Sequence, residues 1–124
     1  MNILAIDYGT KRIGLAVSIM GIISPIESVK NNSDFITILK KIIEENRIEK
    51  IYVGISDGPI VSKIKEFVKD LSSVLQLPVE TVDEAVSTIE ANEIFVQNKK
   101  KDKKFKASID SIAAAVILRR VIES

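Results

Sequence analysis

Four acidic residues stand at points where the sequence passes from one expected element to the next. Asp7 ends an apolar run near the N-terminus, Asp83 and Glu84 end another in the second half, and Asp110 opens the last apolar segment. Carboxylates that gather at one edge of a sheet repel one another, and a divalent cation relieves that repulsion. Oxygen ligands suit Mg2+ or Mn2+, and one or two such ions can activate water for phosphodiester hydrolysis.

Each of these acids also has an ordinary structural explanation. Asp7 can serve as a turn former at the end of a strand, and Glu84 can be an exposed loop residue. Asp110 can interact favourably with the dipole at a helix N-terminus. A metal centre requires the carboxylates to meet in space, so the residues alone leave both interpretations open.

The composition narrows the chemistry that remains. The chain has 124 residues, which predicts one compact domain over residues 1–124, and it contains no cysteine and no histidine. Disulfide scaffolds, thiolate metal sites, Ser-His-Asp catalysis and nearly all zinc chemistry are therefore excluded. Catalysis would have to use carboxylates, lysines, hydroxyls or a metal held by oxygen. The net charge of +1 argues neither for nor against a nucleic-acid partner.

Targeting signals are not visible in the sequence. The apolar N-terminal run ends at Asp7 without a basic segment before it, which is unlike a secretory signal. No stretch approaches the roughly 18 apolar residues of a spanning helix. We therefore expect a cytoplasmic protein without a membrane segment.

The order of elements predicts an α/β fold. Strands are expected over 3–6, 13–18 and 22–29, the first two as an antiparallel hairpin and the third at a sheet edge because of Pro25. Gly9 and Gly14 are expected to serve the turn and a close backbone approach in that hairpin. Helices over 35–43 (capped by Ser33), 61–75, 87–96 and from Ser108 onward alternate with strands over 51–55 and 78–82. Crossovers make these later strands parallel, so the sheet is mixed and five-stranded with helices packed on it.

One segment identifies a family. Residues 7–14, Asp-Tyr-Gly-Thr-Lys-Arg-Ile-Gly, closely resemble the opening motif of the pre-16S ribosomal RNA nucleases, which are also described as Holliday junction resolvases. Segments 52–58, 82–88 and 109–118 resemble later motifs of the same family in the same order. The resemblance covers nearly the whole chain. It implies that the α/β sheet is of the ribonuclease H-like type.

The resemblance also implies roles for particular residues. Asp7, Glu84 and Asp110 would be the catalytic carboxylates that bind Mg2+ or Mn2+, with Asp83 in reserve. Lys11 and Arg12 would hold a phosphate or balance the acidic cluster. An equal alternative is that both are solvated residues of a turn with no binding role. The implied activity is that of a metal-dependent hydrolase, an endonuclease or exonuclease, in 5′-end maturation of pre-16S ribosomal RNA.

The sequence departs from the family pattern at two positions. Ala85 occupies the position where the family usually has arginine, which removes a cation from the implied site. The loop over residues 55–59 is also shorter than the usual version. A non-catalytic RNA-binding module of the same fold is therefore one alternative function.

A lysine-rich segment precedes the helix that carries Asp110. It spans residues 99–106 and includes Lys103 and Lys106, which would attract a phosphate backbone, although a solvated loop is an equal alternative. The expected partner is nucleic acid, structured RNA first and branched DNA second.

Two further functions remain open. A Holliday junction resolvase would be expected to dimerise for two symmetric cuts, whereas the sequence indicates only a monomer or a weak homodimer. An ATP-binding domain of the actin and sugar-kinase type shares the Asp-x-Gly-Thr pattern after its first strand. That class clamps the nucleotide between two domains, and 124 residues supply one.

Overall fold

The computed structural model describes residues 1–55, 58–83 and 109–123, and residues 109, 110 and 123 are described by their backbone alone. The helix expected over 87–96, the lysine-rich segment over 99–106 and the cap at Ser108 lie outside these ranges. None of the helices in the described ranges is long and apolar enough to cross a membrane.

The sheet has the mixed topology that the sequence predicts. Its strands are β1 (Ile3–Asp7), β2 (Arg12–Ile19), β3 (Ile22–Lys30), β4 (Lys50–Ile55) and β5 (Val79–Asp83). They lie in the order β3-β2-β1-β4-β5. Neighbours among β1, β2 and β3 are antiparallel, whereas β4 runs parallel to both β1 and β5. The strand with Pro25 is at the sheet edge, as expected, because proline there interrupts no ladder on its outer side.

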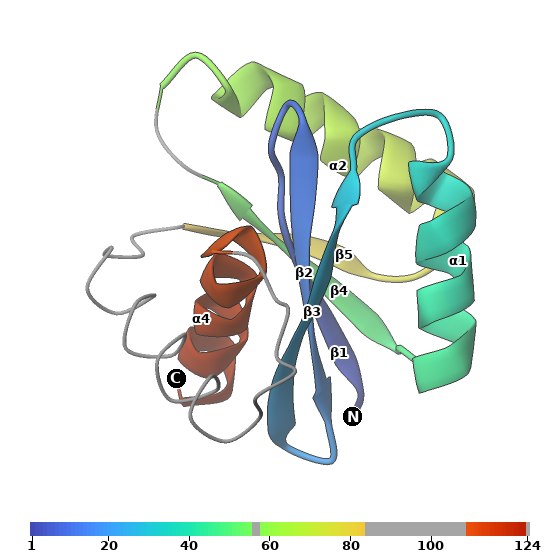
Figure 1. Ribbon diagram of the computed structural model, residues 1–124, viewed down its shortest axis with the longest axis vertical. Coiled ribbons are helices and arrows are strands. Elements are labelled where there is room, and N and C mark those ends of the chain that lie inside the picture. Colours follow the sequence, from blue (N-terminus) through green and yellow to red (C-terminus); the bar gives the residue numbers. More distant parts are fainter. Residues whose placement is uncertain (56–57, 84–108, 124) are drawn as a thin grey trace.

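The described helices cover both faces of the sheet. They are α1 (Phe35–Asn46), α2 (Val61–Leu75) and α4 (Ile109–Glu123). Figure 1 shows α1 and α2 on one side of the strands and α4 on the other. The prediction of Ser33 as the cap of α1 is wrong. The cap is Asp34, whose backbone N–H donates to Oδ1 of Asn32, so a side-chain turn delays the helix by one residue.

The face toward α1 and α2 is packed with large aliphatic side chains. Leu4 and Ile6 of β1 point to it, because side chains alternate along a strand. Their fully or nearly fully buried partners on the other elements are Ile13, Leu15, Val17, Ile51, Val53, Phe35, Leu39, Ile64 and Leu71. The regular apolar stripes of α1 and α2 are those predicted from the sequence.

The face toward α4 is lined by small side chains. Ala5 of β1 and Ala16 of β2 pack against Ala114 and Ala115 of the helix, together with Ile117 and Leu118. From its spacing alone, the sequence predicts one apolar face on α4, made of Ile109, Ile112, Ala113, Val116, Ile117 and Val121, and this prediction is wrong in part. The side chains of Ser111, Ile112 and residues 114–118 are all buried, whereas Ala113 and Val121 are half-exposed. A helix that is apolar all round is buried on all sides, so its spacing does not single out one packed face.

Candidate functional site

Asp7 occupies the last position of β1, in the middle of the sheet. It is half-buried, and its neighbours in register are Gly14 on β2 and Gly54 on β4. Because residues directly opposite one another share a face, neither neighbouring strand places a side chain beside the Asp7 carboxylate. Asp7 follows Ala5 by two residues, so it belongs to the α4 face. The two glycines leave room beside the Asp7 carboxylate for a hydrated cation.

The end of β5 lies two strands from β1, with Asp83 paired in register with Ile55 of β4. Val79 packs against the core under α1 and α2, and Val82 packs against the alanine cluster under α4. Strand alternation therefore puts Asp83 on the α1 and α2 face, opposite Asp7, where it is exposed. The geometry does not support Asp83 as a reserve partner of Asp7. Glu84 lies outside the described residues.

A buried hydrogen bond fixes the start of α4 over the same edge. The backbone N–H of Leu15 donates to Oγ of Ser111, with a donor–acceptor distance of 3.4 Å. Leu15 is paired with Ile6, the residue before Asp7. Asp110, adjacent to Ser111 in the chain, thus enters the helix beside the carboxyl end of β1, although its side chain is not described.

The described side chains do not by themselves complete a metal centre. Among them, no group of three or more acids gathers at one point. Two of the three predicted ligands, Glu84 and Asp110, have no described side chain. The set Asp7, Glu84 and Asp110 therefore stays a prediction, supported by the position of Asp7 and by the anchoring of α4.

The turn between β1 and β2 is held by a residue that the sequence did not single out. Asn31 donates its backbone N–H to the carbonyl of Lys11 and its side-chain amide to the carbonyl of Gly9, each at 2.9 Å. A side chain at Gly9 would collide with the carbonyl of Arg12, which explains the glycine there. Lys11 on this turn and Arg12, the first residue of β2, are both exposed. Nothing local in the sequence links Asn31 to a turn 22 residues away.

Lys103 and Lys106, the other predicted substrate contacts, lie outside the described residues. The described side chains include two of the four predicted basic contacts, Lys11 on the turn after Asp7 and Arg12 at the start of β2.

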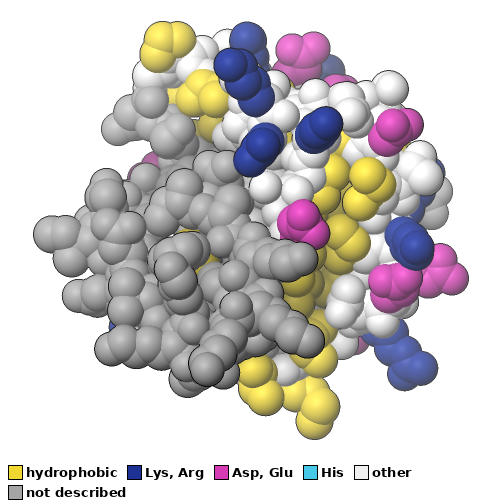
Figure 2. Space-filling view, in the orientation of Figure 1, with side chains coloured by type: hydrophobic (Ala, Val, Ile, Leu, Met, Phe, Trp, Pro, Cys, Tyr) yellow, Lys and Arg dark blue, Asp and Glu magenta, His cyan; other side chains and the backbone are white. Residues whose placement is uncertain are grey.

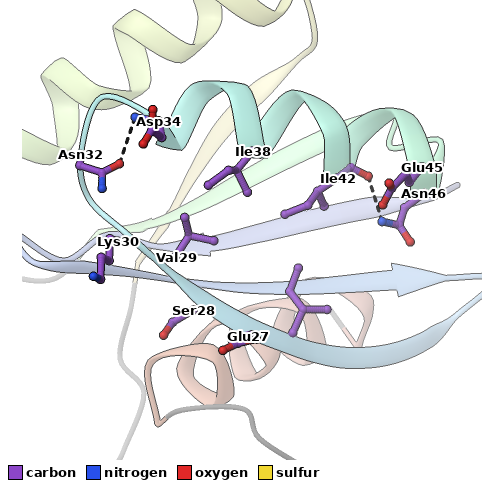
Figure 3. Close-up of a pocket in the computed structure, with 11 residues that line it drawn as sticks. Glu27, Ser28, Val29, Lys30, Asn32, Asp34, Ile38, Ile42, Glu45 and Asn46 are labelled. Carbon is purple, nitrogen blue, oxygen red and sulfur yellow. Dashed lines mark hydrogen bonds between the residues drawn. The ribbon is translucent and has the colours of Figure 1, made fainter.

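A groove elsewhere in the molecule is not part of this edge. It lies between β3 and α1 and has a volume of about 570 Å³. Its lining combines apolar side chains, Ile38 and Ile42 among them, with polar residues that include Lys30 and Glu45. Figure 3 shows it on the α1 side of the strand, with the bond between Asn32 and Asp34 at one end. It lies on the face opposite Asp7, so the candidate site is an open sheet edge rather than this hollow.

Comparison with known proteins agrees with the fold and the motif. A family model described as "RuvX: Holliday junction resolvase" matches residues 1–124. A protein of Halothermothrix orenii named "Putative pre-16S rRNA nuclease" is 33% identical over 129 residues, which cover 96% of this chain and 92% of that protein. One of the same name from Chlorobium phaeobacteroides is 35% identical over 134 residues, or 99% of this chain and 92% of the relative.

Two solved structures of proteins in complex with Holliday junctions have the same architecture. Fowlpox virus resolvase in complex with Holliday junction DNA matches with a TM-score of 0.61 and 14% identity, over 100% of both chains. Thermus thermophilus RuvC in complex with a Holliday junction substrate matches with a TM-score of 0.61 and 16% identity, over 100% of this chain and 98% of that one. At these identities the likeness shows the fold, which is ribonuclease H-like as the sequence resemblance implies.

Proposed function

The chain belongs to the RuvX family of resolvase-like proteins, and on that premise we propose that it is a metal-dependent nuclease that cleaves phosphodiester bonds in pre-16S ribosomal RNA. The observation that carries the proposal is the position of Asp7. It ends the central strand, faces α4 and has glycine on both sides. No other acid of the described strands combines these three features.

Asp7, Glu84 and Asp110 would hold the divalent ion. Asp83 lies on the wrong face, which leaves Glu84 as the acid of that pair, and Ser111 brings the backbone of Asp110 to the Asp7 edge. Mg2+ or Mn2+ bound there would supply an activated water and offset charge on the leaving oxygen. The chain offers only oxygen ligands, since it has no histidine or cysteine, and these suit either ion.

The exposed cations at the turn between β1 and β2 have a separate role. Lys11 and Arg12 begin four residues after Asp7, at a turn whose carbonyls are fixed by Asn31. We assign them to the phosphates that flank the cleaved bond, with Lys103 and Lys106 as further contacts. Arginine can grip a phosphate with two donors, whereas lysine acts as a point charge. A cytoplasmic location, where bacterial ribosomal RNA precursors are processed, belongs to the same proposal.

Cleavage assays on two substrates test the proposal. Purified protein is incubated with a labelled pre-16S ribosomal RNA fragment or a four-way DNA junction, with Mg2+, Mn2+ or a chelator. We expect metal-dependent cleavage of the RNA that falls by at least ~10²-fold in Asp7→Asn, the scale for removal of a preorganised charge-stabilising group. The control is Asp70→Asn, an exposed acid of α2 on the opposite face, which should cleave like the wild type.

The second substrate separates the alternatives. Cleavage of the junction but not the RNA would assign the protein to recombination, in keeping with the family description and with the junction-bound proteins of the same fold. Binding of RNA without cleavage, unchanged by chelator or by Asp7→Asn, would instead identify a non-catalytic module and point to Ala85.

A further inference from the structure

The edge strand β3 contains one more residue than its partner requires. Leu15 is paired with Ile26 and Ile13 with Val29, so Glu27 and Ser28 together oppose the single residue Gly14. This is a β-bulge, which disturbs the regular alternation of side chains beyond it. In Figure 3, Glu27 and Ser28 both lie on the side of β3 away from α1, whereas Val29 points toward α1.

The bulge reverses the faces of the last two residues of β3. Ile23 packs on the α4 side, and strict alternation from it would put Val29 on that side and Lys30 on the other. Val29 instead packs in the core under α1 and α2, together with Ile13. By alternation from Val29, Lys30 is turned to the α4 face, at one end of the β3–α1 groove that it also borders, and it is paired in register with Arg12. The extra residue thus moves a lysine onto the face of the sheet that carries Asp7.

The pair formed by Arg12 and Lys30 is unfavourable for the protein alone. Both side chains are exposed, and like charges directly opposite one another in a ladder repel. Neither makes an ion pair with an acid among the described side chains, Glu27 of the bulge included. A polyanion bound across the pair would remove the repulsion. Figure 2 shows Lys and Arg side chains gathered at the end of the molecule where Figure 1 draws the turn between β1 and β2.

The spacing suits a phosphate chain that starts at the candidate site. Gly14 is paired with Asp7, and Arg12 lies two residues before Gly14, ~7 Å away along β2 and beyond the end of β1. Lys30 lies one strand further across, ~5 Å from Arg12 in the sheet. Asn31, the next residue, ties the end of β3 to the carbonyls of Gly9 and Lys11. The backbones of Arg12 and Lys30 are therefore held in place relative to Asp7.

We propose that Lys30 joins Arg12 in binding a backbone phosphate of the nucleic-acid substrate that flanks the cleaved bond. This extends the substrate path from the Asp7 edge across the ends of β2 and β3. The inference rests on the proposed function, because it assigns a further positioning residue to the same substrate. Lys30 does not act on the reacting atoms, so its loss weakens binding and leaves the chemical step unchanged.

The salt dependence of binding tests this role. The affinity for a pre-16S ribosomal RNA fragment is measured in Mg2+ at several salt concentrations, in an Asp7→Asn background that keeps the RNA intact. We expect Lys30→Ala to reduce the slope of log K against log salt by ~0.7 to 0.9, the value for one lost phosphate contact. Lys30→Arg should retain the slope. The control is Lys40→Ala, an exposed lysine of α1 on the opposite face, which should leave the slope unchanged.

Cleavage by the otherwise wild-type chain provides the second readout. Lys30→Ala should raise KM with kcat unchanged, because the contact is made equally in the ground state and the transition state. An unaltered slope and KM in Lys30→Ala, with RNA still cleaved by the wild type, would overturn the role of Lys30 alone. Failure of the wild-type chain to bind or cleave any nucleic acid would overturn both this role and the proposed function.

Discussion

The two faces of the sheet are built from different residues and have different roles in stability and in the position of α4. The face under α1 and α2 is filled by leucine, isoleucine, valine and phenylalanine, whereas the face under α4 is lined by Ala5 and Ala16 against Ala114 and Ala115. Large side chains bury most apolar area per residue and thus supply most of the hydrophobic stabilisation. Small ones let the helix backbone approach the strands closely. The first face therefore stabilises the fold, and the second sets where the start of α4 stands relative to Asp7.

Leu4 and Ala5 allow that division to be tested within one strand. They are consecutive residues of β1, both fully buried, and they point to opposite faces. A substitution at each position disturbs one face and leaves the other intact. The comparison predicts a loss of stability from the first and a loss of activity from the second.

The larger effect on stability is expected from Leu4→Ala. The substitution leaves a cavity in the core under α1 and α2, and comparable changes lower the free energy of unfolding by about 2 to 5 kcal/mol. Chemical denaturation measures the loss. Below the unfolding transition, the cleavage rate per folded molecule should match that of the wild type, because the α4 face is untouched. A rate that falls with Leu4→Ala as it does with Asp7→Asn would show that the faces are not separable.

A smaller effect on stability but a larger one on activity is expected from Ala5→Leu. Added methylenes between β1 and α4 cost about 1 to 3 kcal/mol through overpacking. They also push the start of α4 away from Asp7, and a displacement of ~1 Å can cost ~10²-fold in rate. The cleavage rate per folded molecule, measured for both variants, should be lower for Ala5→Leu than for Leu4→Ala. Full activity in a folded Ala5→Leu protein would mean that the position of α4 does not matter for catalysis.

The same two faces show why the sequence predicts some features and not others. The stripes of α1 and α2 repeat at helical spacing, so these helices, the five strands and the edge position of Pro25 could all be predicted. The packing of α4 could not, because apolar residues surround that helix and no spacing marks the side that meets Ala5. Local pattern specifies a face only where one side of an element is polar.

The candidate site also has features that the sequence predicts and features that it does not. Asp7 could be found from its motif at the end of an apolar run. The face on which Asp83 lies depends on which side chains of β5 alternate to each side of the sheet. The extra residue of β3 appears only when the register of β3 with β2 is known. The contacts of Asn31 with the β1–β2 turn join residues 22 positions apart in the case of Gly9. Such features arise from pairing between strands, which composition and spacing along one chain do not record.

The smallest effect on stability is expected from the ion pair of Lys50 and Glu80, at the edge of the α4 face. Charges rather than apolar packing join β4 and β5 there. Nζ of Lys50 lies 3.2 Å from Oε2 of Glu80 on β5 and 5.0 Å from the ring centroid of Tyr52. Interaction with the Tyr52 side chain, and second with Glu80, raises the pKa of Lys50 above its ordinary value. A raised pKa in the folded state means that the stabilisation is complete at neutral pH and is lost only as the pH rises through that pKa.

Glu80→Gln should therefore lower the pKa of Lys50 toward its ordinary value, which a side-chain NMR titration measures. The Tm of the variant should lie slightly below that of the wild type by a constant amount around neutral pH, and the two should converge in strongly alkaline solution. A Tm difference that instead grew with rising pH would contradict the sign of the linkage. An effect as large as that of Leu4→Ala would contradict the comparison itself, because it would make this ion pair, rather than the packed face, the main source of stability.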